Sequence, residues 1–242
     1  MLYFRSAIFL IWFLTISIVI HILALPTLAL PWRFAQGAAR VWGNLVLWGL
    51  RVFCNLTYEV RGNHAAATRP VLVAAKHFSM WETITLVSLL PRPVFVMKRS
   101  LMRLPLYGWY SRRAGMIAVD REGGAAELRR MVAGAQRALA QGRPIVIFPE
   151  GTRKAPGDPP DYKPGVAGLY GQLGVPCVPV ALNSGLYWTA GGLLKRPGTI
   201  VVEFLEPIPP GLRPRDFMAL LEERIETASR RLVAEGRAVL DQ

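Results

Sequence analysis

The sequence predicts an α/β fold, in which a mostly parallel central sheet is flanked by helices and preceded by a membrane-embedded pair of N-terminal helices. Three observations support this class. A long uncharged apolar run opens the chain, short β-branched runs then alternate with helical stretches, and the last segment again shows helical periodicity. Such alternation is typical of parallel sheets, whose strands need crossover connections. We expect the helices in residues 1–57 and one α/β domain in residues 58–242.

The first element is an apolar helix. From Ser6 to Trp32 the chain contains no Asp, Glu, Lys or Arg, and residues 7–25 are mostly Ile, Leu, Val, Phe, Trp and Ala. A helix of this length is long enough to span a bilayer. A cleaved signal peptide is the alternative, but only Arg5 forms a basic start, and the apolar run exceeds the usual core of about 7–15 residues.

A second apolar segment follows at residues 41–53, where tryptophans lie between Arg40 and Arg51. This composition is typical of a helix at the membrane interface, although an ordinary core helix explains it equally well. Arginines at positions 33, 40, 51 and 61 follow the first helix, whereas only Arg5 precedes it. The positive-inside tendency therefore predicts that the globular body lies in the cytoplasm.

The rest of the chain alternates between strands and helices. Apolar residues recur at helical spacing over about 18 residues around Met131, and again from Arg215 to the end, which predicts two amphipathic helices. Six short runs rich in β-branched residues predict buried strands. These runs are residues 70–75, 93–97, 116–119, 144–148, 177–182 and 199–204.

The charge balance is strongly basic. The chain has 29 Lys and Arg against 16 Asp and Glu, a formal net charge of +13. Nucleic acid, an anionic membrane and phosphorylated small molecules all suit such a surface, and the apolar N-terminus favours the membrane. Nucleic acid is not expected, because no stacking-aromatic motif or recognition helix is present. With only three histidines and two separated cysteines, we expect neither a metal site nor a disulfide framework.

Polar residues follow four of the predicted strands. These groups are Lys76 with His77, Lys98 with Arg99, Asp120 with Arg121, and residues 149–153. In α/β sheets, ligands bind at the carboxyl ends of the strands. We therefore expect a concave site with one proton acceptor and several cations, which suits a hydroxyl-bearing phosphorylated substrate.

His77 precedes Glu82 with four residues between them. A histidine can take a proton from a hydroxyl near neutral pH, and a carboxylate behind it orients the ring and stabilises the imidazolium. The spacing therefore predicts a general-base dyad. The alternative is a purely structural His–Glu pair.

Four motifs in this order resemble those of the glycerolipid acyltransferases, over about residues 58–210. They are His77 with Glu82, GMIAVDRE from Gly115, FPEGTR from Phe148, and VPVAL from Val178. Within that family, the sequence is most similar to the bacterial 1-acyl-glycerol-3-phosphate acyltransferases, which make phosphatidic acid. One residue departs from the pattern: the family's usual acid in the first motif is Asp, and this chain has Glu82. The longer side chain must fold back, or sit on a wider turn, to reach the imidazole.

The resemblance implies roles for individual residues. His77 would deprotonate the 2-hydroxyl of lysophosphatidic acid, which attacks the acyl thioester directly. The absence of a G-x-S-x-G motif agrees with a reaction that has no acyl-enzyme. Arg121 and Arg153 would bind the acceptor phosphate, with Lys98 as a third cation. The FPEGTR loop that carries Arg153 also contains Glu150, Gly151 and Thr152, and the resemblance implies that all three bind substrate. Gly151 permits an unusual backbone conformation or a close ligand approach. Glu150 either bonds a glycerol hydroxyl or clamps the loop and Arg153.

The implied partners are membrane lipids, lysophosphatidic acid and an acyl donor, either acyl-CoA or acyl carrier protein, with no further cofactor. The implied location is the cytoplasmic face of the bacterial inner membrane, with the first helix either spanning the bilayer or re-entering one leaflet. Other acceptors remain open, namely glycerol 3-phosphate or another lysolipid such as a lyso-aminolipid. From another class, a non-catalytic membrane protein that binds anionic lipid also fits the basic surface.

Overall fold

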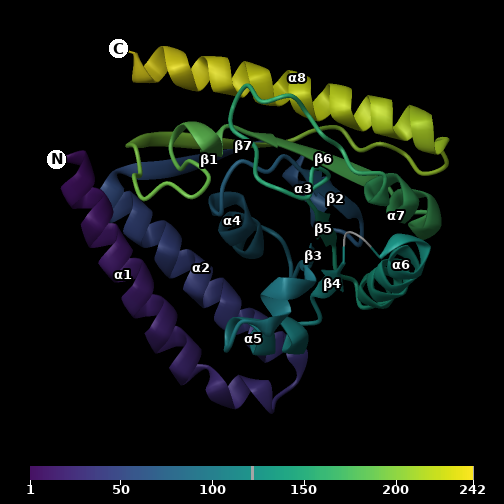
Figure 1. The fold of residues 1–242 in the computed structure, drawn as a ribbon, viewed down its shortest axis with the longest axis horizontal. Helices are drawn as coiled ribbons and strands as arrows, with labels where there is room; N and C mark the ends of the chain where they lie inside the picture. The colour runs from purple at the N-terminus through teal and green to yellow at the C-terminus, as the bar shows by residue number, and fades with distance from the viewer. Residues whose placement is uncertain (121–122, 242) are drawn as a thin grey trace.

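The computed structural model describes residues 1–120 and 123–241 (Figure 1). Its strands are β1 (Leu56–Gly62), β2 (Leu72–Ala75), β3 (Val94–Lys98), β4 (Ile117–Val119), β5 (Ile145–Ile147), β6 (Cys177–Leu182) and β7 (Gly198–Phe204). In this described part of the chain they form one seven-stranded sheet in the order β1-β7-β6-β2-β5-β3-β4. Neighbouring strands are parallel except for β6 and β7. The prediction of a mostly parallel sheet is confirmed.

Each of the six predicted runs overlaps one strand, but none of them predicts β1. Only Leu56 is fully buried in this strand, and Glu59 and Arg61 form an ion pair at 2.8 Å on its exposed side. β1 lies at the edge of the sheet, where it pairs with β7 alone. A half-exposed edge strand lacks the continuous apolar run that predicts a buried one.

The helices cover both faces of the sheet. In Figure 1, α8 lies along one face together with α6 and α7, whereas α2 and α4 lie on the other face. The central strand β2 is buried on both sides, since Val73 belongs to the core beneath α2 and α4 and Leu72 to the core beneath α6 and α8. The helices are α1 (Leu2–Leu23), α2 (Trp32–Cys54), α3 (His64–Ala67), α4 (Trp81–Leu89), α5 (Tyr107–Arg113), α6 (Gly124–Ala140), α7 (Gly165–Leu173) and α8 (Pro214–Leu240), with 3₁₀ turns η1 (Leu25–Leu28), η2 (Arg99–Arg103) and η3 (Ser184–Leu186).

The two N-terminal helices form an antiparallel pair, and α2 lies between α1 and α4 (Figure 1). Helix α2 buries Val46 and Leu50, so the core-helix interpretation fits this face, while Trp48 and Val52 are exposed on its other side. Among the described residues, α1 alone is long and apolar enough to cross a membrane, which is consistent with membrane association. The domain boundary at residue 57 stays a prediction.

Candidate active site

The four predicted strand-end groups follow β2, β3, β4 and β5, which are neighbours in the sheet and run parallel. Their carboxyl ends therefore meet at one edge, which carries His77, Lys98, Asp120 and the loop 148–153. Arg121, the predicted phosphate ligand after β4, lies outside the described residues. The site is thus described from its other members.

His77 and Glu82 are in direct contact. The imidazole Nδ1 lies 2.9 Å from Glu82 Oε1, and the Glu82 side chain is fully buried. Glu82 lies in the first turn of α4, and Oε1 also accepts hydrogen bonds from the backbone N–H groups of Phe78 and Ser79, each at 2.6 Å. The longer acid therefore reaches the imidazole by folding back over the turn between β2 and α4.

The second oxygen of Glu82 is held as well. Oε2 accepts hydrogen bonds from the hydroxyls of Ser79 at 2.9 Å and Ser184 at 2.8 Å. Because this carboxylate accepts from every partner, the His77 proton is assigned to Nδ1, and Nε2 carries the free lone pair. Nε2 is then the atom that can take a proton from a substrate.

From the sequence, Ser184 follows the fifth predicted strand, where a position near the cleft and a loop role are both considered and the loop role is favoured. Ser184 follows β6, which lies beside β2 in parallel, so the residue reaches the same edge of the sheet as His77. Its position two residues after the VPVAL motif was the available signal. Ser184 joins the fourth motif to the dyad through the carboxylate of Glu82.

The loop after β5 packs against His77. The ring of Phe148 stacks on the imidazole with centroids 4.0 Å apart and planes 16° apart. The N–H of Lys154 donates to the carbonyl of His77 at 2.9 Å. These contacts bring the exposed residues Thr152 and Arg153 to the dyad's side of the sheet edge.

Gly151 makes the turn in this loop. Its φ is +65°, a left-handed value that favours glycine, and its N–H donates to the Phe148 carbonyl at 2.9 Å. A side chain at this position would strain the turn that leads to Arg153. The predicted importance of Gly151 thus has a backbone explanation, whereas substrate contact by Gly151 and Thr152 stays a prediction.

The ends of β3 and β4 are joined by a buried carboxylate. Glu127 on α6 receives Arg99 Nη2 at 2.7 Å and the backbone N–H of Asp120 at 3.0 Å. Burial alone would raise the pKa of Glu127, but these donors hold the pKa below its ordinary value. Arg99 therefore has a structural partner, while Lys98 is exposed at the end of β3.

Glu150 is buried beneath the loop rather than open to solvent. Its Oε1 receives Lys76 Nζ at 2.9 Å, and burial raises the pKa of Glu150 above its ordinary value. The loop-clamping interpretation fits this geometry, with Lys76 as the observed partner where Arg153 was expected. Sequence reasoning missed that pair, although a lysine directly after the buried run of β2 was a signal. Binding of a glycerol hydroxyl by Glu150 stays a prediction.

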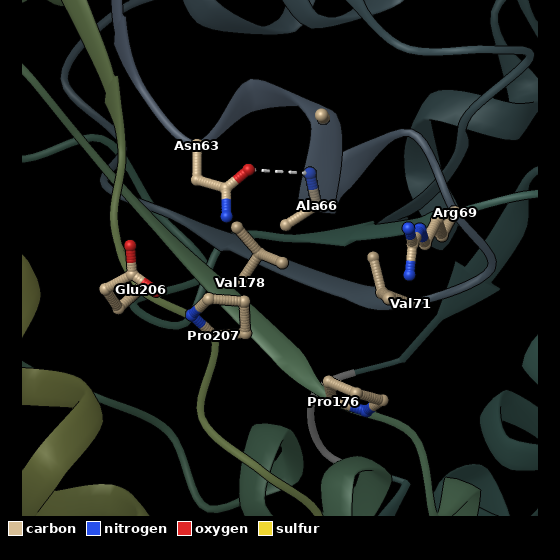
Figure 2. A pocket seen from close by; sticks show the side chains of 9 residues that line it. Asn63, Ala66, Arg69, Val71, Pro176, Val178, Glu206 and Pro207 are labelled. Atoms are coloured by element: carbon tan, nitrogen blue, oxygen red, sulfur yellow. Dashed lines mark hydrogen bonds between the residues drawn. The ribbon is translucent and has the colours of Figure 1, made fainter.

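Within residues 1–120 and 123–241, no group of three or more His, Cys, Asp or Glu side chains is placed to hold a metal ion. Figure 2 shows the residues that line a pocket of about 340 Å³. It is lined by Arg69 and Val71 before β2, Pro176 before β6, and Glu206 and Pro207 after β7. Since His77 follows the carboxyl end of β2, this pocket is at the opposite edge of the sheet.

The acyltransferase family model matches residues 57–183, just over half of the chain. The chain is 35% identical over 161 residues to a 1-acyl-sn-glycerol-3-phosphate acyltransferase of Pseudomonas aeruginosa, a match covering 66% of this chain and 63% of that protein. It therefore spans just under two thirds of that relative. It is 30% identical over 225 residues to the mouse 1-acyl-sn-glycerol-3-phosphate acyltransferase alpha, a match covering 91% of this chain and 77% of that protein.

The crystal structure of the 1-acyl-sn-glycerophosphate (LPA) acyltransferase of Thermotoga maritima superposes with a TM-score of 0.78 at 20% identity, covering 96% of this chain and 98% of that one. That likeness shows a shared fold. The family is shown by the sequence matches, and they include the segment that carries His77, Glu82 and the loop 148–153. The chain belongs to the acyltransferase family.

Proposed function

We propose that this chain transfers a fatty acyl group from an acyl thioester to the sn-2 hydroxyl of 1-acyl-glycerol-3-phosphate, giving phosphatidic acid. The observation that carries the proposal is the contact of His77 Nδ1 with the buried Glu82 carboxylate, beside a loop that presents Arg153. The dyad suits proton abstraction from a hydroxyl, and the arginine suits a phosphate. The relatives named above share this substrate in their names.

In the reaction, His77 Nε2 takes the proton of the sn-2 hydroxyl while the hydroxyl oxygen attacks the thioester carbonyl. The new C–O bond forms, the C–S bond breaks, and the departing sulfur takes the proton from the imidazolium. Glu82 stabilises that imidazolium through Nδ1. The protein thus needs no covalent acyl intermediate.

Neither cysteine is suited to act as a nucleophile. Cys54 and Cys177 are buried, and burial raises the pKa of both thiols, to about 11 for Cys54. Since the thiolate is the nucleophilic form, both groups remain unreactive near neutral pH. Direct attack by the acceptor hydroxyl is the route that the described residues support.

We expect acceptor competition to reveal a requirement for the phosphate. Wild-type protein should use lysophosphatidic acid about 100-fold better than the same lipid without its phosphate, because one charge-assisted contact contributes about 1.5–3 kcal/mol. Arg153→Ala should raise KM for lysophosphatidic acid about 10-fold or more while lowering kcat less. The measurement is product formation in detergent micelles containing both acceptors.

Arg137→Ala is the matched control, since Arg137 is an exposed arginine near the far end of α6. It should leave both constants unchanged. Preference for glycerol 3-phosphate or a lyso-aminolipid over lysophosphatidic acid would contradict the proposed acceptor. Lipid binding without any product would favour the non-catalytic alternative.

We further propose that α1 lies in one leaflet, with its outer face in lipid and the cytoplasmic site beside it. Phe4, Ile11 and Ile18 are 67%, 66% and 60% exposed on one side of this helix. The other side is tied to the body at both ends. Lys195 N–H donates to Ser6 Oγ at 3.0 Å, and Tyr110 donates to the His21 carbonyl at 2.6 Å. Between these ends, Trp12 donates to the Leu45 carbonyl of α2 at 3.1 Å, and Trp42 of α2 donates to Ser17 Oγ at 3.0 Å. Contact at both ends and in the middle of α1 supports a helix lying on the membrane rather than leaving the body to cross it.

The double variant Ile11→Glu with Ile18→Glu should release the protein from anionic liposomes in a flotation assay. Two charges on the lipid-facing side oppose insertion, whereas the packed side of α1 is unchanged. Val239→Glu is the control, because Val239 is 67% exposed on α8. Flotation of the double variant at the level of the control would show that this face does not carry the attachment.

A further inference from the structure

A buried ion-pair network lies beneath the proposed active site. Lys76 Nζ lies 2.9 Å from Glu150 Oε1 and 2.7 Å from Glu226 Oε1, and the hydroxyl of Tyr162 donates to Glu226 Oε1 at 3.0 Å. The side chains of Lys76 and Glu150 are 2% and 1% exposed. The Glu226 side chain is 10% exposed. The charged side chains of Lys76, Glu150 and Glu226 are thus withdrawn from water together.

The network joins segments that are distant in the sequence. Lys76 directly precedes His77, Glu150 lies in the loop that carries Arg153, and Glu226 lies in the middle of α8, 150 residues from Lys76. Helix α8 is outside the family match at residues 57–183. One ammonium group therefore connects the strand end of the proposed base, the loop of the proposed phosphate ligand, and the C-terminal helix.

Burying these charges is costly, and removing one partner leaves another uncompensated. Glu150 Oε2 is buried without a hydrogen-bond partner, which leaves Lys76 as the observed cationic partner of this carboxylate. Without Lys76, the carboxylates of Glu150 and Glu226 would face each other. The energy of such a network depends on the position of each charged group. Because Lys76 directly precedes His77, the position of Lys76 is coupled to the backbone at His77.

We propose that Lys76 and Glu226 are positioning residues for acyl transfer. Glu226 holds the Lys76 ammonium against α8, and Lys76 in turn holds Glu150, so the His77 backbone and the loop 148–153 stay in register. Neither side chain touches substrate. This inference rests on the proposed function and adds to it a dependence of the reaction on the C-terminal helix.

The test compares Glu226→Gln with Glu223→Gln in the full-length protein, using lysophosphatidic acid and an acyl thioester. Both substitutions remove one negative charge from α8, but Glu223 is exposed. Glu226→Gln should lower kcat about 10-fold, since small misplacements of reacting groups cost up to about 100-fold. KM for both substrates should change by less than about 2-fold, because exposed groups bind them. Glu223→Gln should behave as wild type.

Two further variants, Lys76→Met alone and Lys76→Met combined with Glu226→Gln, measure the coupling between Lys76 and Glu226 directly. Lys76→Met should lower kcat more than Glu226→Gln does, because it leaves two buried carboxylates without a cation. Adding Glu226→Gln to Lys76→Met should then restore part of the lost kcat, since only one buried carboxylate remains. A merely structural role would instead lower the melting temperature and the amount of folded protein, and would leave kcat per folded molecule unchanged.

Four results would overturn the inference. Equal kcat values for Glu226→Gln and Glu223→Gln would show that Glu226 has no positioning role. Multiplied losses in the double variant, or a change confined to KM, would show that the network does not act through Lys76 on the chemical step. An inactive wild type would reject the proposed function and, with it, this inference. An active wild type with any of the other results would reject this inference alone, so the two failures are distinguishable.

Discussion

Replacing His77 with alanine is expected to lower the rate of phosphatidic acid formation by about 10²–10⁴-fold, the usual contribution of a positioned general base. The imidazole is the group in contact with Glu82, and its Nε2 carries the lone pair that takes the hydroxyl proton. The remaining activity would come from holding the two substrates together. The rate is measured from a labelled acyl thioester in the presence of lysophosphatidic acid.

His64→Ala is the matched control. His64 lies on α3 at the opposite edge of the sheet, where its Nε2 is 3.2 Å from the Leu89 carbonyl oxygen. Its ring packs edge-on against the ring of Phe204, with the two ring centroids 4.9 Å apart. This variant should keep its activity within about 3-fold of wild type, even though it loses some packing stability. Comparable losses in the His64→Ala and His77→Ala variants would contradict the specific role of His77.

Glu82→Gln is expected to lower kcat about 100-fold while the protein stays folded. The amide oxygen can keep the three bonds that Oε1 receives from His77 Nδ1 and the backbone of Phe78 and Ser79. The amide nitrogen can donate to the hydroxyls of Ser79 and Ser184, which rotate to accept. The imidazole therefore keeps its tautomer and loses the negative charge that stabilises the imidazolium.

Glu82→Asp keeps the negative charge of the carboxylate and tests whether the length of the side chain matters. The shorter side chain withdraws the carboxylate from His77 and from the two backbone donors, unless α4 moves toward them. We expect a kcat between those of wild type and Glu82→Gln, with thermal denaturation as the check on folding. Full activity in the Asp variant would show that the extra methylene of Glu82 is dispensable for the dyad.

The buried part of the sheet was predictable because each central strand carries apolar residues on both faces. β1 was not, since Glu59 and Arg61 interrupt its apolar pattern at an exposed edge. The contact of His77 with Glu82 followed from spacing within one turn, so local sequence was sufficient to predict it. The pairing of Lys76 with Glu226 was not predictable, because it depends on how α8 packs across β6.

The difference between what local sequence predicts and what depends on tertiary packing also applies to the rest of the site. The predicted strand-end groups meet at one edge because β2, β5, β3 and β4 are neighbours in the sheet and run parallel. Ser184 reaches Glu82 across 102 residues only because β6 lies beside β2. Local pattern therefore predicts the reacting groups, whereas the groups that hold them come from tertiary neighbours that single-sequence patterns do not reveal.

Complementation of a bacterial strain conditionally deficient in phosphatidic acid synthesis tests the central claim most directly. Wild-type protein should restore growth under non-permissive conditions, and His77→Ala should not restore it at matched protein levels in the membrane fraction. Growth supported by His77→Ala would contradict the general-base role. Failure of the expressed, membrane-bound wild type to restore growth would contradict acyl transfer to lysophosphatidic acid.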